Sequence, residues 1–220
     1  MKVVVIAAHP DDELLGAGGT LAKHAQSGDT VHAVICSEGA TSRYADGMES
    51  ELEAAGRRAA AILGLASLRF LRLPDQRLDA LPLVEVVQRL ETALEEFDPE
   101  IVYTHAPGDI NADHGVVARA VRTACRPYRF PRLRRLAAFE TPSSSEWGGP
   151  PGLPPFTPQL FIDITATLDA KIAAFECYAS EVRPWPHPRS ARALRERAAT
   201  WGSLIGRAAA EPFLLLRETD

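Results

Sequence analysis

Short apolar runs alternate along the chain with longer segments in which apolar residues recur at helical spacing. The first run, 2–8, is rich in valine and ends at a histidine, which is typical of a strand buried on both faces. The same pattern predicts further strands at 30–36, 67–73, 101–104, 133–139, 160–164 and 212–216. Helical spacing predicts helices at 13–26, 48–63, 82–97, 113–125, 166–180 and 190–209. This alternation predicts a mainly parallel sheet with helices on both faces.

Two polar segments interrupt the alternation. The segment 37–47 contains glycines and a single Arg-Tyr pair, and it is predicted to be a loop. The segment 141–158 is rich in proline, glycine and serine, and we expect it to form a mobile loop that shapes a pocket. The strands that follow it are expected to add to an edge of the sheet. There is no internal repeat or second domain boundary, so residues 1–220 are predicted to form one α/β domain.

Composition narrows the class of protein. With 220 residues and 46% hydrophobic content, the chain can bury one sizeable core. Its net charge of −5 argues against electrostatic binding to nucleic acid or to an anionic membrane, and the arginines of 126–135 are best interpreted as a solvated flank. Three cysteines without a Cys-x-x-Cys motif fit a reducing cytoplasm. The sequence has no run long enough to span a membrane, and its N-terminal run is too short for a signal peptide.

Polar clusters follow two of the predicted strands. His9-Pro10-Asp11-Asp12-Glu13 ends the first strand, and Asp109-Ile110-Asn111-Ala112-Asp113-His114 lies just past the fourth. Ligands of open α/β sheets bind at the carboxyl ends of the strands. In a doubly wound order these two strands are neighbours, so we expect the two clusters to converge.

The residue types in these clusters suit a catalytic metal site. Such a site needs three protein ligands and leaves a position for water, and His9, Asp12 and His114 supply two imidazoles and a carboxylate. This set suits Zn²⁺ and also Fe²⁺. Asp11 is then available as the general base of a metal-dependent hydrolase.

Each cluster also has a simpler interpretation. A lone histidine near a strand end is usually structural, and acids after a strand often cap the next helix. Asn111, Asp113 and His114 could likewise form a turn and an N-cap. The metal interpretation is favoured because both clusters lie at strand ends that should be adjacent.

Taken together, the motifs resemble a known family. Residues 7–13, followed by Gly16-Ala17-Gly18-Gly19-Thr20, resemble the first motif of the PIG-L/LmbE-like zinc-dependent N-acetylglucosaminyl deacetylases, and residues 109–114 resemble the second. Weaker likeness extends through residues 73–75, 146–147 and 185–190. The resemblance implies a Rossmann-like fold and hydrolysis of N-acetyl groups on sugar-containing small molecules. It implies zinc ligation by His9, Asp12 and His114 and proton transfer by Asp11.

Substrate contacts are less clearly marked. Some relatives that act on sugar-thiols carry a histidine where Asn111 stands, and it helps to stabilise the oxyanion; Asn111 or another residue must do this here. His187, in a loop with three prolines, is a candidate donor or substrate contact, with packing on Trp185 as the alternative. Arg43 is a candidate substitute for an Arg-x-x-Glu motif that we do not find. Asp113 is placed at the same site, where it could orient a metal ligand.

Two other classes of function compete. Gly16-Ala17-Gly18-Gly19 could indicate a nucleotide-binding Rossmann-like module, but a dinucleotide fingerprint has its glycines directly after the strand, where this chain has carboxylates. An inactive or repurposed sugar-binding module would lack a ligand or a base, and this sequence has all of them. A homo-oligomer remains compatible with the sequence.

Overall fold

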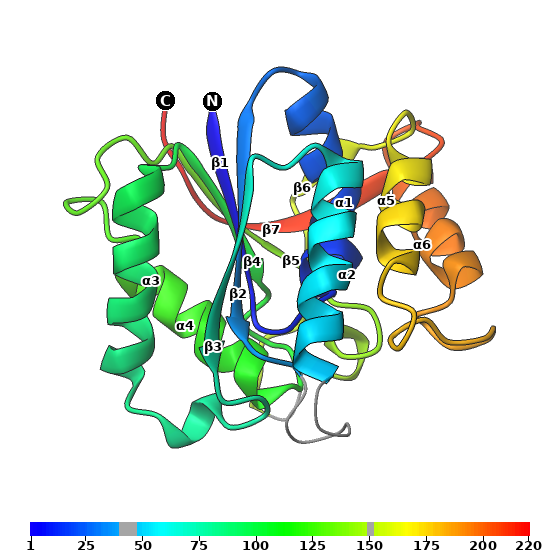
Figure 1. Cartoon of the computed structure of the whole chain (residues 1–220). Coiled ribbons are helices and arrows are strands. Elements are labelled where there is room, and N and C mark those ends of the chain that lie inside the picture. Colours follow the sequence, from blue (N-terminus) through cyan, green and yellow to red (C-terminus); the bar gives the residue numbers. More distant parts are fainter. Residues whose placement is uncertain (40–47, 149–151) are drawn as a thin grey trace.

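The computed structural model describes residues 1–39, 48–148 and 152–220, and shows one sheet with helices on both faces (Figure 1). The seven strands are β1 (Lys2–Ala7), β2 (Thr30–Ser37), β3 (Ser67–Leu73), β4 (Ile101–His105), β5 (Arg135–Phe139), β6 (Leu160–Asp163) and β7 (Ala210–Glu218). The α-helices are α1 (Asp12–Gln26), α2 (Met48–Leu63), α3 (Leu83–Phe97), α4 (Ala112–Ala124), α5 (Leu168–Glu176) and α6 (Ala191–Ser203). Two short 3-10 helices are η1 (Leu78–Ala80) and η2 (Ser145–Trp147).

The strand order is β3-β2-β1-β4-β5-β7-β6. The first five strands in this order are parallel, whereas β7 pairs antiparallel with both β5 and β6. The predicted mainly parallel, Rossmann-like sheet is therefore confirmed. The adjacency of β1 and β4 is also confirmed, and it brings the two polar clusters to the same edge of the sheet.

The core has two layers because side chains of β1 alternate between the faces of the sheet. Val3 and Val5 pack toward α1, α2 and α5, whereas Val4 and Ile6 pack toward α3 and α4. Figure 1 shows the same division, with α3 and α4 on one side of the sheet. Because β1 is buried on both faces, its carboxyl end is a rigid platform for the residues that follow it.

The C-terminal third differs from its predicted boundaries. The helix predicted at 166–180 ends at Glu176, where the chain turns to bury Tyr178. The helix predicted at 190–209 ends at Ser203, because the chain turns back and the Arg207 amide donates to the Gly202 carbonyl. The residues after Ser203 instead lead into β7, which is longer than predicted. This strand lies inside the sheet, between β5 and β6, so β6 forms the edge on this side.

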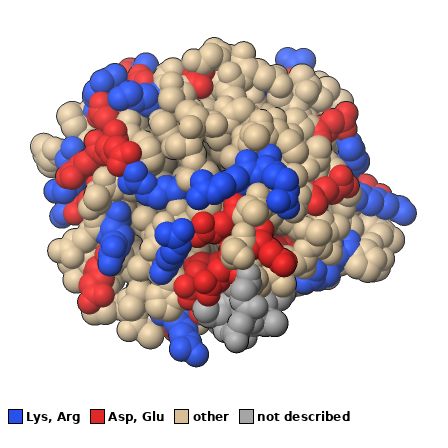
Figure 2. All heavy atoms as spheres, viewed as in Figure 1, with Lys and Arg blue, Asp and Glu red and all other residues tan. Residues whose placement is uncertain are grey.

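The surface carries charges of both signs. Figure 2 shows basic and acidic side chains close together on the face that it presents. Within the basic stretch 126–135, Arg129, Arg132 and Arg135 each pair with a nearby carboxylate, as expected for a solvated flank. In the described part of the chain, no helix is both long and apolar enough to cross a membrane.

Candidate active site

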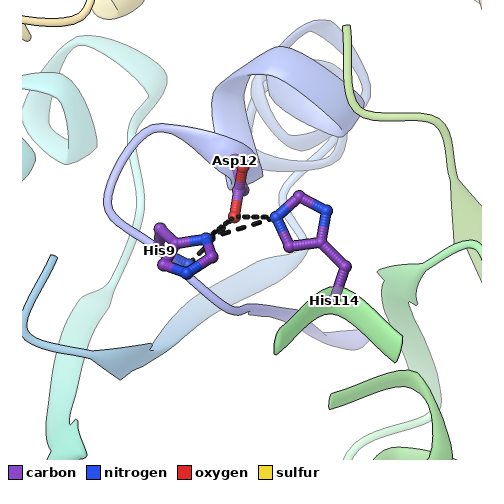
Figure 3. Close-up of side chains that lie close together, drawn as sticks. All are labelled: His9, Asp12 and His114. Atoms are coloured by element: carbon purple, nitrogen blue, oxygen red, sulfur yellow. Dashed lines mark hydrogen bonds and ion pairs between the residues drawn. The ribbon is translucent and has the colours of Figure 1, made fainter. Parts of the chain in front are cut away.

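Three predicted metal ligands meet at the carboxyl ends of β1 and β4 (Figure 3). His9 and Asp12 come from the turn between β1 and α1, and His114 comes from the first turn of α4. Oδ2 of Asp12 lies 3.1 Å from Nδ1 of His9 and 3.2 Å from Nε2 of His114, and the two nitrogens are 3.2 Å apart. Two imidazole nitrogens and one carboxylate oxygen therefore face a common point.

This cluster fits a divalent metal ion. Two nitrogens and one oxygen are the ligand set of many catalytic zinc sites, and all three side chains are nearly buried. The second oxygen of Asp12, Oδ1, is buried without a hydrogen-bond partner among the described residues. A buried carboxylate oxygen without a partner is costly, and a cation beside it would remove that cost. The cluster is thus a candidate metal centre.

A buried acid stands behind each histidine. Oδ2 of Asp113 lies 3.1 Å from Nε2 of His9, and its other oxygen accepts a hydrogen bond from the Leu78 amide. This contact fixes the His9 ring so that Nδ1 faces the cluster. Asp113 is 1% exposed, so its position suits the orienting role better than direct contact with a substrate.

His114 is held by Asp109 and His105. Oδ1 of Asp109 lies 3.1 Å from Nδ1 of His114. The His105 ring stacks on the His114 ring at 4.0 Å. Burial and the neighbouring His114 lower the pKa of His105 to about 3, so this ring is neutral at pH 7. Its Nε2 accepts a hydrogen bond from the Ala8 amide, so the ring that stacks on His114 is also bonded to the residue that follows β1.

We expect Asp109→Asn to weaken metal binding about 10–100-fold. Burial opposes ionisation of Asp109, but His114 and the hydroxyls of Ser144 and Ser145 lower its pKa to about 2, so a full negative charge stands behind His114. Asparagine keeps the shape and removes that charge. Competition with a chelator of known affinity measures the change, with Asp169→Asn at an exposed site as the control. Equal affinities for the two variants would contradict the orienting role.

Asp11, which lies between His9 and Asp12 in the sequence, has a strained backbone. Its backbone has φ 103° and ψ −28°, a conformation that non-glycine residues rarely adopt. Its side chain makes no capping bond to α1, so the interpretation of Asp11 as a simple N-cap does not hold. Instead, Oδ2 of Asp11 accepts a hydrogen bond from Nη1 of Arg189 at 3.0 Å. Burial raises the pKa of Asp11 well above its usual value, and the Arg189 charge opposes this shift.

Glu13 and Tyr178 support the turn that carries Asp11. Oε2 of Glu13 accepts a hydrogen bond from the Asp11 amide at 3.1 Å, and Oε1 accepts one from the Tyr178 hydroxyl at 3.1 Å. Burial raises the pKa of Glu13 to about 7. These contacts hold the Asp11 backbone in its strained conformation.

A cleft beside the cluster has two parts, which share some of their lining residues. The part above Asp11 is lined by His9, Gln76 and Leu52, and the part beside His114 is lined by Ser143, Trp147, Arg183 and His187. Asn111, Glu181 and Arg189 border both parts. The structure therefore places Asn111 and His187 in the cleft, and their contact with a substrate stays a prediction. Arg43 lies outside the described residues.

Several residues that line the cleft lie outside the two sequence motifs. They include Glu181, Arg183 and Arg189, which lie 170 or more positions after Asp11, in the segment between α5 and α6. Only the weak likeness around residues 185–190 pointed to this segment. Gln76, whose Nε2 lies 3.0 Å from Nε2 of His9, had no signal beyond its place after a strand.

The glycines of α1 have a packing role. A Cβ on Gly16 would lie 2.1 Å from the Phe139 ring, and one on Gly19 would lie 2.7 Å from Ile164. They sit inside the helix, not in a loop before it. Close packing accounts for these glycines, so they give no support to a nucleotide-binding fingerprint.

The fold and the cluster together describe an α/β protein with a candidate metal centre at the carboxyl edge of its sheet. The family profile described as "PIG-L: GlcNAc-PI de-N-acetylase" matches residues 4–125. The chain belongs to this family of de-N-acetylases.

Similar proteins include more than one chemistry. The chain is 32% identical to the Escherichia coli K12 protein "Uncharacterized deacetylase YaiS" over 81% of this chain and 90% of that protein. It is 29% identical to the Pseudomonas putida "4-oxalmesaconate hydratase" over 84% of this chain and 76% of that protein. The solved structure of the conserved protein TT1542 from Thermus thermophilus is similar with a TM-score of 0.81, 27% identity and coverage of 100% and 96% of the two chains.

Proposed function

We propose that this protein is a metal-dependent hydrolase that removes the N-acetyl group from an N-acetylglucosamine-type or related sugar-containing small molecule. The observation that carries the proposal is the buried Asp11 carboxylate, which borders an open cleft directly beside the His9–Asp12–His114 cluster. Membership of the de-N-acetylase family supports the choice of an acetamide as the bond that is cleaved.

His9, Asp12 and His114 would hold Zn²⁺ or, with the same ligand set, Fe²⁺. A bound ion would supply Lewis-acid chemistry, which lowers the pKa of a water molecule and polarises a carbonyl group. Asp11 would take the proton of the attacking water and deliver it to the leaving nitrogen. Asp113 would orient His9.

Asn111 and His187 would donate hydrogen bonds to the substrate, and one of them would face the oxygen of the acetyl group as negative charge develops. We propose Arg43 as a further substrate contact from its sequence position alone. The unpaired cysteines Cys36, Cys125 and Cys177 support an action in the cytoplasm.

A hydratase is the second candidate, because a relative at 29% identity bears that name. Hydration of a double bond also needs an activated water and a base, so the same cluster suits it chemically. The two reactions differ in their product, since only the deacetylase releases acetate.

The test is release of acetate from a panel of N-acetylated sugars, sugar-thiols and nucleotide sugars. We expect acetate from at least one of them, loss of that activity after treatment with a chelator, and its return when Zn²⁺ or Fe²⁺ is added. Activity that survives complete removal of metal would contradict the proposal. Acetate from none of these substrates, together with hydration of an unsaturated carboxylic acid, would favour the hydratase.

A further inference from the structure

The part of the cleft beside His114 contains a basic residue to which no role has been given. Arg183 follows α5 and lines this part together with Asn111, His187 and the exposed ring of Trp147. We call Arg183, His187 and Asn111 the Arg183 subsite. It adjoins the candidate metal centre because His114 borders the same hollow.

Arg183 is held in place by carbonyl groups. Its Nη1 donates to the carbonyl oxygens of Ser180 and Val182. Within residues 1–39, 48–148 and 152–220, no carboxylate lies at ion-pair distance from it, whereas Arg189 pairs with Asp11 and Glu181. The side chain is thus partly ordered before a substrate arrives, and its charge and its remaining N–H groups are available to the cleft.

The other two members of the subsite also present donors. Oδ1 of Asn111 accepts the Asp113 amide as the N-cap of α4, which leaves the NH₂ group for the cleft. Nδ1 of His187 accepts the Arg189 amide at 3.0 Å. Burial, with Arg189 and Arg183 nearby, lowers the pKa of His187, so the neutral ring carries its single proton on Nε2. In both residues the acceptor is used within the protein, so the group that remains is a donor.

Glu181, the acid that borders this part of the cleft, does not neutralise Arg183. Glu181 borders the hollow, but its Oε2 is 3.0 Å from Nη1 of Arg189, which also pairs with Asp11, so Glu181 is paired with a cation other than Arg183. Arg183 is then the one arginine of this part of the cleft that has no carboxylate of the described residues at ion-pair distance. A wall of donors and one positive charge is complementary to a group that has only acceptors.

We propose that the Arg183 subsite binds an anionic oxygen group, a carboxylate or a phosphate, through Arg183 and whichever of Asn111 and His187 does not face the acetyl oxygen, so that the substrate is an N-acetylated sugar carrying such a group. The inference rests on the proposed deacetylation for its substrate class. Trp147, which is 59% exposed at the same hollow, offers an aromatic face for the sugar ring.

The test compares kcat/KM for acetate release from N-acetylglucosamine with that from its 1-phosphate, its 6-phosphate and N-acetylmuramic acid. The phosphates and the lactyl carboxylate separate the two sources of negative charge. We expect at least one anionic sugar to exceed the neutral one, and Arg183→Gln to reduce this preference about tenfold or more, mainly through KM. Arg183→Lys should keep part of the preference, because it retains the charge.

Each variant is judged by the ratio of its kcat/KM values for an anionic and a neutral sugar. A loss of folded protein lowers both values equally and so leaves this ratio unchanged. Arg132→Gln is the control, and it should leave the ratio unchanged. Arg132 lies before the amino end of β5, at the end of the sheet opposite the cleft, and pairs with Asp98. A wild-type preference for the neutral sugar, or an equal ratio in wild type and Arg183→Gln, would overturn the subsite.

A binding measurement keeps this proposal separate from the deacetylase itself. Metal-free protein is titrated calorimetrically with glucose 6-phosphate and with glucose. Tighter binding of the phosphate that is lost in Arg183→Gln would support the subsite even if no sugar released acetate. Equal binding of the phosphate by both proteins would overturn it whatever the enzyme assays show.

Discussion

Changing Asp11 to asparagine is expected to lower kcat about 10²–10⁴-fold, the usual contribution of a general acid–base residue, while the protein keeps its metal. Asparagine has nearly the same shape as aspartate but cannot accept a proton from water. His9, Asp12 and His114 are unchanged in the variant, so the metal ligands stay in place. The rate is measured on the best substrate of the acetate panel, and bound metal by elemental analysis.

The controls for this experiment separate proton transfer from structure. Asp169→Asn, at an exposed helix position, should retain the wild-type kcat. Arg189→Met keeps the Asp11 side chain but removes the guanidinium that opposes the rise in its pKa. If Asp11→Asn turned over substrate at the wild-type rate, Asp11 would not be the base, and the proton would have to pass through another group at the cleft.

The loop between β4 and α4 shows how far a sequence pattern can be followed into a site. Asp109, Asn111, Asp113 and His114 lie within six residues, and each has a separate contact. Asp109 stands behind His114, Asn111 caps α4, Asp113 stands behind His9 and His114 faces Asp12. The N-cap interpretation was thus correct for Asn111, and it left the two acids and the histidine free for the site.

The fold could be predicted because its signals are local. Buried parallel strands are continuous apolar runs, and each surface helix shows its own spacing, so the order of elements follows from the chain. The pairing of β1 with β4 then brings His9 near His114, since parallel strands end at the same edge. The predicted ligands needed only this step to converge.

The segment after α5 gave no such signal. Arg189 reaches Asp11 from 178 positions away, and nothing in the local pattern of 181–190 says which edge of the sheet it meets. The end of α5 was missed for a related reason, because Tyr178 leaves this helix to bond Glu13, and a tertiary contact therefore decides where the helix ends. The end of α6 is local, at a turn in which the Gly202 carbonyl accepts the Arg207 amide.

Removing the His114 imidazole should abolish stable metal binding. His114→Ala leaves only His9 and Asp12 of the cluster, and we expect metal affinity to fall by more than the 10–100-fold typical of losing an orienting acid. A bound ion stabilises the folded state, so added Zn²⁺ should raise the Tm of the metal-free wild type but not that of the variant. Elemental analysis after dialysis gives the stoichiometry directly.

A second histidine provides the comparison. His32 stacks on Phe97 near the amino end of β2, and His32→Ala should keep full metal content even if it lowers the Tm. Full stoichiometry in His114→Ala would remove His114 as the third ligand. The ion would then have to lie on the other side of the His9 ring, where Asp75 and Asp113 form a second group of three possible ligands with it. Asp113 would in that case be a ligand, and Asp113→Ala, not His114→Ala, would release the metal.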